Sequence, residues 1–412
     1  MLRSPRSGRA LLRSLLVILV LTLLLAEGVL RMGWIQGYTR AEMRPSFEQF
    51  QAKAIAQGHP YLAYSLKPDL DTDHSGSFRR TTTNSAGYRG PLVAKPKPAG
   101  TFRVLCLGGS STHGTTPTDD AHTWPARLQE HLRTDTGNGA IEVLNFGVFG
   151  YSTFESLINL ELRGVDFEPD LVLVYHTIND MRCALYKPGG PVQPDNTQWR
   201  AIWPVLMPSP GESLLEKSLV YCAWRKRFTS YLSRFEKLDA FAIVNYDPMH
   251  PDPYAGPVAD LGFENFARNL KSIHAVARAH GAQVMYITQG CDRADMGAGS
   301  KQLQWDGMDR MGEILKTVAH ETSSAFCDAR PVLETAFAQV PAEVQQLEKD
   351  ATPLLGKAKD TEDYRRGVEL WQRFTQEGIF TGEVHLTDRG ADLLARTVAD
   401  TIFLAAILER KP

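Results

Sequence analysis

Metal-binding signatures, paired-cysteine motifs and a surplus of charge are all missing from this 412-residue chain. No two of its five cysteines fall in a CxxC spacing, which excludes a zinc knuckle or a thioredoxin-type site. The chain also lacks an HExxH helix, a phosphate-binding glycine loop and a Gly-x-Ser-x-Gly elbow. A formal net charge of −2 provides no basic surface for nucleic acid. We therefore expect no metal, no other cofactor and no nucleic-acid partner.

The odd number of cysteines leaves at least one of them unpaired within the chain. Cys106 and Cys327 lie in apolar, strand-like runs, so we expect both to be buried as small hydrophobic side chains. Outside the cytoplasm one disulfide could form, and the sequence does not indicate which pair of cysteines would form it.

The amino terminus carries an apolar run over residues 15–26, interrupted only by Thr22 and followed by Glu27. This run is shorter than the ~20 residues that span a bilayer comfortably. Basic residues ahead of an apolar segment stay in the cytoplasm, so the rest of the chain should lie outside. Four arginines precede the run: Arg3, Arg6, Arg9 and Arg13.

Two interpretations of this run compete, a cleaved signal peptide and a signal anchor that continues as far as Leu30. The small-x-small cleavage pattern is poor because Leu24 lies two residues before Ala26, and we favour the anchor. Residues 1–34 are then a cytoplasmic tip and a transmembrane helix. This predicts a single-pass protein of the inner (cytoplasmic) membrane whose main body is periplasmic.

The rest of the chain divides into an extension and a main domain. Residues 35–100 are rich in proline and glycine, with an extended Lys-Pro-Lys-Pro linker, and predict a stalk and N-terminal extension that packs on the main domain. The main domain is expected over residues 101–410, with insertions at 183–257 and 333–379 near the rim of its site. Tryptophans in the first insertion either stack on sugar rings or simply pack: Trp199, Trp203 and Trp224.

Short apolar runs alternate with helical patterns through the main domain. Nearly all-apolar strands separated by helices predict a parallel sheet covered by helices on both faces. Thr387 is a good N-cap for the last helix. The expected strands are 102–107, 141–144, 171–175, 283–287 and 325–327, and the expected helices are 124–132, 153–163, 261–280, 303–320 and 386–408.

Four motifs at strand or helix ends carry groups suited to chemistry, although each alone is a weak signal. Ser110 lies in a glycine-rich turn directly after the first strand, where an open parallel sheet binds ligands. Gly147 and Asn179 follow the second and third strands and offer N–H groups to an oxyanion. His385 precedes the last helix and can reach the end of the first strand. Taken singly, a turn glycine, an Asx-turn or an incidental histidine explains each position equally well.

Together, these motifs resemble those of the SGNH (GDSL-type) hydrolase family over residues 102–405. The resemblance implies a three-layer, flavodoxin-like α/β fold with a parallel sheet. It also implies Ser110 as nucleophile, His385 as general base, and Gly147 and Asn179 as oxyanion donors beside the Ser110 amide. The matching segments are Gly108-Gly109-Ser110-Ser111-Thr112, Asn145 to Gly150, Thr177-Ile178-Asn179-Asp180 and Gly382-Glu383-Val384-His385.

Three positions depart from the family's pattern. Gly109 replaces the aspartate of the usual Gly-Asp-Ser, at a position without a chemical role, and Thr177 replaces a glycine, which narrows the pocket. Gly382 stands where the family's acid belongs. Glu383 is then the first candidate to orient the imidazole. Asp328, or a backbone carbonyl serving a Ser–His dyad, is the alternative.

The function implied by the resemblance is that of an extracytoplasmic serine esterase or acylhydrolase. It would remove acyl or acetyl groups from an ester-bearing glycan or lipid of the cell envelope, without a metal. A polysaccharide O-acyltransferase that uses the same serine is one alternative. A catalytically degraded binding protein is another, motivated by Gly382.

Overall fold

The computed structural model of the protein describes residues 5–36, 38, 55–73, 80–185, 192–196, 214–215, 217–228, 258–293 and 300–410. Trp199, Trp203 and much of the first predicted insertion lie outside these ranges. The chain forms two compact units. One comprises residues 1–58 with 203–248, and the other comprises residues 59–202 with 249–412.

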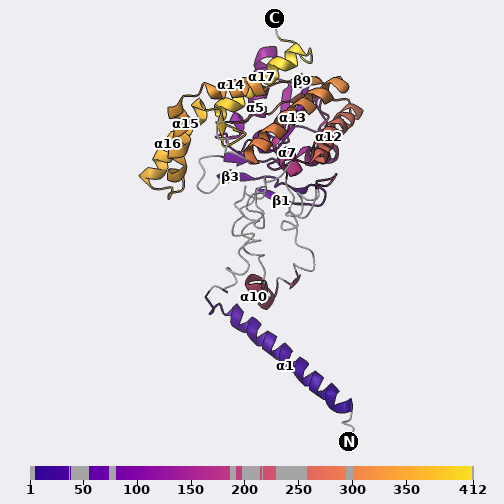
Figure 1. The fold of residues 1–412 in the computed structure, drawn as a ribbon, viewed down its shortest axis with the longest axis vertical. Coiled ribbons are helices and arrows are strands. Elements are labelled where there is room, and N and C mark those ends of the chain that lie inside the picture. The colour runs from indigo at the N-terminus through magenta and orange to yellow at the C-terminus, as the bar shows by residue number, and fades with distance from the viewer. Residues whose placement is uncertain are drawn as a thin grey trace. The chain divides into compact units, whose positions relative to one another are not determined.

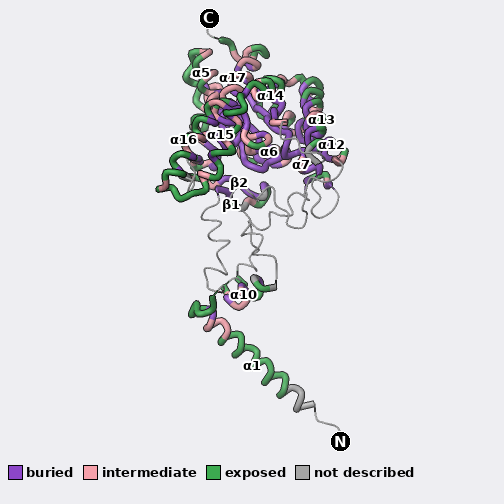
Figure 2. The backbone as a smooth tube through the Cα atoms, turned by 60° about the vertical axis from the view of Figure 1, so that its left-hand side comes forward, coloured by how far each residue is buried: buried purple, intermediate pink, exposed green. Residues whose placement is uncertain are grey.

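The first unit contains the long helix α1 (Pro5–Arg31) and the short helix α10 (Leu219–Phe228). The stretch Ala10–Arg31 of α1 is long and apolar enough to cross a membrane, with a mean hydropathy of 2.3, and its most apolar part is exposed (Figure 2). A signal sequence passes the same test. The helix continues through the position at which the apolar run of the sequence is interrupted.

The residue that interrupts this run, Glu27, caps the N-terminus of α10. Its carboxylate accepts hydrogen bonds from Ser218 Oγ at 2.9 Å, Leu219 N at 3.1 Å and Val220 N at 3.0 Å. The first N–H groups of a helix have no partner within it, and an acidic side chain satisfies them. Leu30, one turn further along α1, packs on α10. The one acidic residue in this apolar helix thus caps the N-terminus of a second helix, α10.

The second unit is built on a parallel five-stranded sheet with the strand order β6–β5–β7–β8–β9. All five residues of β7 are buried, as is expected of a strand covered on both faces. Each strand agrees with its prediction to within one residue at either end. The strands are β5 (Phe102–Gly108), β6 (Ile141–Asn145), β7 (Leu171–Tyr175), β8 (Gln283–Ile287) and β9 (Ala325–Cys327).

Helices cover both faces of this sheet (Figures 1 and 2), which confirms the three-layer α/β fold. Alternate side chains of β5 point to opposite faces: Val104 and Cys106 join one core, and Leu105 and Leu107 join the other. The first core includes α5 (Trp124–Thr136), α14 (Arg330–Ala338), α15 (Ala342–Leu355), α16 (Glu362–Glu377) and α17 (Asp388–Leu404). The second includes α7 (Ile178–Leu185), α12 (Asp260–Ala279) and α13 (Ser300–Glu321), with α6 (Thr153–Asn159) beside them.

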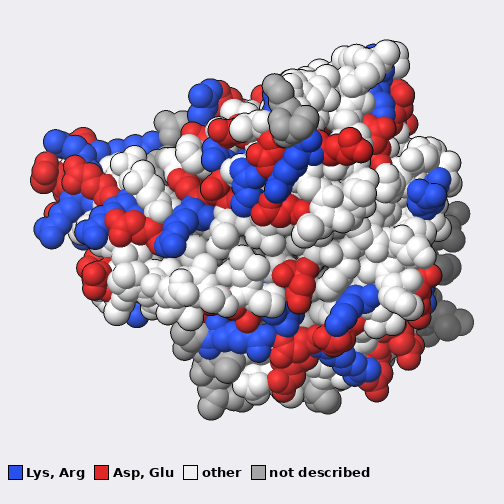
Figure 3. All heavy atoms as spheres, turned by 90° about the horizontal axis from the view of Figure 1, so that it is seen from above, with Lys and Arg blue, Asp and Glu red and all other residues white. Residues whose placement is uncertain are grey.

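The helices differ from their predictions mainly at their ends. The helix expected over 153–163 is α6 followed by a π-helical turn, Leu160–Gly164. Thr387 caps α17, as predicted, by accepting a hydrogen bond from Gly390 N at 3.0 Å. This last helix ends at Leu404. Most of the second predicted insertion forms α15 and α16. On the face of the molecule shown in Figure 3, acidic and basic side chains are intermixed.

The N-terminal extension contains strands that the sequence did not reveal: β1 (Ala56–His59), β2 (Ala63–Leu66), β3 (Asp71–Asp73) and β4 (Arg80–Thr82). Strands β3 and β4 pair in an antiparallel ladder. From His59 onward the extension belongs to the same compact unit as the sheet. Tyr64 packs there against Phe149 and Tyr151, and the Tyr151 hydroxyl donates to the Tyr64 carbonyl at 2.5 Å.

All five cysteines lie in the described part of the chain, and all five are buried without a disulfide between any of them. Cys106 and Cys327 are 0% and 1% exposed, which confirms their predicted burial. The disulfide that the sequence left open does not form.

Candidate active site

Ser110 opens the short helix α4 (Ser110–His113), two residues beyond the end of β5. Both preceding glycines are required by close contacts. A Cβ on Gly108 would lie 1.9 Å from Thr112 Oγ1, and one on Gly109 would lie 2.6 Å from Asn179 Nδ2. Gly109 therefore has a role that the sequence did not indicate, because it lets the Asn179 amide approach the serine turn.

His385 is presented by a small hairpin of β10 (Phe380–Thr381) and β11 (His385–Leu386), in which Thr381 pairs with His385. Gly382, in the turn, has φ +57°, a conformation that glycine adopts far more readily than other residues. The hairpin brings His385 Nε2 to 2.9 Å from Ser110 Oγ, and both side chains are half-buried. Gly382, which stands where the family has its acid, therefore provides the left-handed backbone conformation of this turn.

The two carboxylates considered as the orienting acid both have other partners. Glu383 Oε2 accepts hydrogen bonds from Arg182 Nη2 at 2.6 Å and from Gln304 Nε2 at 3.3 Å. Asp328 Oδ1 accepts one from Thr288 Oγ1 at 2.7 Å. Glu383 thus ties the histidine hairpin to α7 through an ion pair and to α13 through a hydrogen bond.

The two residues expected to serve as oxyanion donors differ in their surroundings. Asn179 is buried beside the serine turn, and its Nδ2 donates to the Tyr151 carbonyl at 2.9 Å, which fixes the amide plane. The Gly147 amide donates instead to Asn145 Oδ1 at 3.0 Å. A Cβ on Gly147 would lie 2.3 Å from His113 N, so this loop packs against the backbone of α4.

A small pocket, partly open to solvent, lies beside Ser110. Thr177, which replaces the family's glycine, is buried in its wall, where its hydroxyl donates to the His176 carbonyl. The lining residues are Gly109, Ser110, Ser111, Tyr175, His176, Thr177, Ile178, Asn179 and Gln289.

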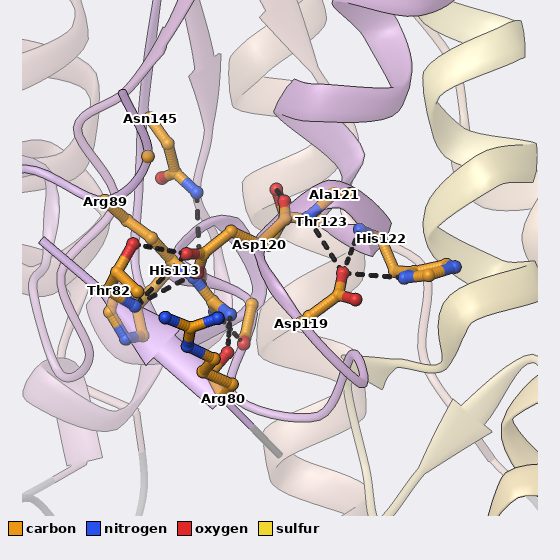
Figure 4. Close-up of polar contacts among 12 residues, drawn as sticks. Arg80, Thr82, Arg89, His113, Asp119, Asp120, Ala121, His122, Thr123 and Asn145 are labelled. Atoms are coloured by element: carbon orange, nitrogen blue, oxygen red, sulfur yellow. Dashed lines mark hydrogen bonds and ion pairs between the residues drawn. The ribbon is translucent and has the colours of Figure 1, made fainter. Parts of the chain in front are cut away.

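A buried arginine of the N-terminal extension holds the far end of the nucleophile helix (Figure 4). Arg89 Nη1 donates to the carbonyls of His113 (2.7 Å) and Gly114, the last residues of α4 and its cap. Its Nε pairs with Asp120 at 2.5 Å, and the Asp120 carboxylate also accepts from Thr82 N at 3.2 Å. A cation near the C-terminal end of a helix satisfies carbonyls that have no partner within the helix.

Replacing Arg89 with methionine should lower the free energy of unfolding by about 3–5 kcal/mol, because it leaves buried carbonyls and the Asp120 carboxylate without their cation. Urea denaturation of the purified protein measures this. Arg80→Met is the matched control: Arg80 pairs with Asp71 at the surface, and its loss should change stability little. Equal effects of the two substitutions would contradict the assignment.

A second buried polar group lies under the pocket. His176 Nε2 is 2.7 Å from Ser156 Oγ, and its Nδ1 is 3.8 Å from Asp180 Oδ2. Burial lowers the pKa of His176 to about 3, so the ring is neutral. Burial raises the pKa of Asp180 to about 7 against the hydrogen bonds from Thr153, and the nearby Glu155 raises it further.

The raised pKa of Asp180 predicts a pH dependence of stability. Between pH 4 and 7 the folded protein keeps a proton on Asp180 that the unfolded chain releases, so the contribution of Asp180 to stability falls as pH rises. The contribution of His176, whose pKa is lowered, rises over most of the same range and opposes it. In Asp180→Asn only the His176 contribution remains, so the slope of the free energy of unfolding against pH should be more positive than in the wild type. Denaturation curves at pH 4, 5, 6 and 7 for both proteins test this, and parallel slopes would refute it.

Some residues that shape the site escaped the sequence interpretation: Ser111, Arg182 and Gln289 beside it, and Arg89 behind it. Gln289 lies two residues after β8, and a polar residue following a strand is the same signal that singled out Ser110 and Asn179. Arg89 and Arg182 left no such signal, because nothing in the local sequence indicates which distant carbonyl or carboxylate a long side chain will reach.

A three-layer α/β fold with a serine and a histidine in contact beyond the ends of its parallel strands defines a class of hydrolases acting on ester bonds. A family model described as GDSL-like lipase/acylhydrolase matches residues 106–393, and the chain belongs to this family. No curated protein matches the chain.

Several solved structures are similar to this chain over about three quarters of its length. An acetylxylan esterase from Geobacillus stearothermophilus is 15% identical, with 74% of this chain and 95% of the esterase covered and a TM-score of 0.38. A catalytic mutant of that enzyme is 13% identical, with 74% and 96% covered and a TM-score of 0.39. A putative GDSL-like lipase from Parabacteroides merdae is 12% identical, with 74% and 96% covered and a TM-score of 0.40.

Proposed function

We propose that the protein is a membrane-tethered, extracytoplasmic serine esterase with Ser110 as nucleophile and His385 as general base. The observation that best supports this is the 2.9 Å distance between Ser110 Oγ and His385 Nε2, within reach for proton transfer. The imidazole would take the hydroxyl proton as Oγ bonds to the ester carbonyl carbon. It would then protonate the departing alkoxide oxygen, leaving an acyl-enzyme. A water that gives a proton to His385 would release the acid, and Ser110 would regain its proton.

The oxyanion of the tetrahedral intermediate needs preorganised N–H donors. We assign this role to the amide of Ser110, at the start of α4, and to Asn179 Nδ2, which borders the same pocket. The Gly147 amide could join them only by releasing Asn145 Oδ1. Gly150 is a better donor from that loop. It lies directly before Tyr151, whose carbonyl accepts the hydrogen bond from Asn179 Nδ2. Within the described ranges the Gly150 amide donates no backbone hydrogen bond.

The role of Glu383 follows from its ion pair with Arg182. We propose that Glu383 positions His385 through the hairpin, by fixing it to α7, rather than by bonding to the imidazole. Glu383→Gln, which keeps the shape of the side chain, should therefore lower kcat by far less than the ~10⁴-fold that loss of an orienting acid costs in a serine protease. Steady-state kinetics measures this, and a loss approaching 10⁴-fold would restore Glu383 as the third member of a triad.

The location and the substrate class are inferred from the helix and the pocket. Helix α1 would anchor the protein in the inner membrane, with the arginine-rich end in the cytoplasm and the sheet domain in the periplasm. We propose a short acyl group, such as acetyl, on an envelope glycan or lipid as the group removed, because the pocket beside Ser110 is small. Protease treatment of spheroplasts should degrade the sheet domain, and its protection would overturn this orientation.

Covalent labelling and hydrolysis test the proposed chemistry directly. The purified full chain should hydrolyse p-nitrophenyl acetate and accept a fluorophosphonate on the peptide that contains Ser110, and Ser110→Ala should abolish both. Ser324→Ala is the matched control, because Ser324 Oγ also lies 2.9 Å from a histidine nitrogen, Nδ1 of His274. Equal hydrolysis by the wild type and Ser110→Ala would favour a catalytically degraded binding protein.

A further inference from the structure

A buried line of hydrogen bonds runs behind the catalytic groups and connects four segments that are far apart in the chain. The Ile178 N–H donates to Gln289 Oε1 at 2.9 Å. Gln289 Nε2 donates to Ser111 Oγ at 3.2 Å, and Ser111 Oγ donates to the Val384 carbonyl at 2.9 Å. All four residues are at most 5% exposed. We call this arrangement the Gln289 chain.

Three members of the Gln289 chain are the immediate sequence neighbours of the groups proposed to act. Ser111 follows the nucleophile Ser110, Ile178 precedes Asn179, and Val384 precedes His385. Only Gln289 comes from a loop that contributes no proposed catalytic group. The chain therefore ties the nucleophile, the oxyanion donor and the base to one another through the end of β8.

The direction of every hydrogen bond in the Gln289 chain is fixed by its two ends. A backbone N–H can only donate, so the Gln289 atom that faces Ile178 is its oxygen, and its NH₂ group faces Ser111. The Val384 carbonyl can only accept, so the Ser111 proton points toward it. Position 289 must therefore offer an acceptor to the Ile178 N–H and a donor to Ser111 Oγ. A side chain with only acceptors, or with no polar group, cannot do both.

We propose that Gln289 and Ser111 are positioning residues that set the distance between Ser110, Asn179 and His385. This inference rests on the proposed function and assigns to it two residues outside its chemistry. In a water-excluded site such hydrogen bonds are strong, and a catalytic group displaced by about 1 Å can cost on the order of 10²-fold in rate. Both residues also line the pocket beside Ser110, but the polar atoms of their side chains are engaged within the Gln289 chain, so we expect KM to change little compared with kcat.

The test compares four variants of the full chain with the wild type. Ser111→Ala and Gln289→Met break the chain, Gln289→Glu keeps its shape but removes the donor, and Ser111→Thr restores a hydroxyl. Gln129→Met is the matched control, because Gln129 Oε1 also accepts a backbone N–H, that of Val143 at 2.9 Å, far from the site. Kinetics with p-nitrophenyl acetate, the rate of fluorophosphonate labelling and the melting temperature are measured for each.

We expect kcat and the labelling rate to fall together by about tenfold to hundredfold in the three chain-breaking variants, with KM nearly unchanged. Ser111→Thr should recover most of the loss, and Gln129→Met should leave both rates unaltered. The double variant Ser111→Ala/Gln289→Met should lose little more than the worse single variant, because one broken link already interrupts the chain.

Several results would overturn the proposal. These are unchanged kcat in variants that melt like the wild type, a rise in KM alone, or losses that multiply in the double variant. In each of these cases the wild type still hydrolyses ester through Ser110, so the proposed function survives. A wild type that neither hydrolyses nor labels would sink the proposed function instead, and the chain would then have nothing to position.

Discussion

Replacing His385 with alanine should lower kcat for p-nitrophenyl acetate by about 10⁶-fold, the loss seen when a serine protease loses its base. The physical reason is that the Ser110 hydroxyl is a weak nucleophile at neutral pH unless a neighbour takes its proton, and His385 Nε2 is 2.9 Å away. Stopped assays at high enzyme concentration measure the residual rate. Labelling of Ser110 by a fluorophosphonate should slow in parallel.

The control for this prediction is His320→Ala, since His320 is exposed on α13. Added imidazole offers a further check, because a small base can enter the space left by the removed ring and restore part of the activity. If His385→Ala kept more than a tenth of the wild-type rate, another group would have to serve as base, and the proposed mechanism would be wrong.

The next largest loss should follow the removal of the Asn179 amide. Asn179→Ala is expected to lower kcat by about 10²- to 10³-fold with a small change in KM, because an oxyanion donor acts mainly in the transition state. Its Nδ2 is already oriented by the Tyr151 carbonyl, so in the wild type the amide does not have to rearrange to donate to the oxyanion. Steady-state kinetics of the purified variant measures both constants.

A second substitution separates the position of this amide from its presence. In Gly109→Ala the added methyl group would lie 2.6 Å from Asn179 Nδ2 and must push it away, so kcat should fall although the amide remains. Asn138→Ala, in an exposed turn, is the control. A rise in KM without loss of kcat in Asn179→Ala would make Asn179 a substrate-binding residue instead.

The sheet could be predicted from the sequence because buried parallel strands leave an unambiguous pattern. The runs at β5 and β7 are nearly all apolar, and helical periods separate them from the next strands, so their order along the chain implied the layers. The approach of His385 to Ser110 also followed, because both residues flank elements whose ends meet at one edge of the sheet.

Side-chain partners could not be predicted in the same way. The carboxylate of Glu383 was expected near His385, yet it bonds to Arg182, which lies about two hundred residues earlier in the chain. Gly147 was expected to offer its amide to substrate, yet the short side chain of Asn145 reaches that amide first. Such choices depend on distances of a few tenths of an ångström between distant segments, which motif spacing does not record.

The helix that follows His385 has a consequence for biosynthesis. Helix α17 is held to α5, the helix that comes after the serine turn, by ion pairs of Asp392 with Arg127 at 2.8 Å and of Arg396 with Asp135 at 2.6 Å. The docking of α17 beside α5 thus helps to hold the base near the nucleophile. During synthesis, Ser110 would leave the ribosome long before the histidine that activates it. A chain that ends before α17 should therefore have no esterase activity.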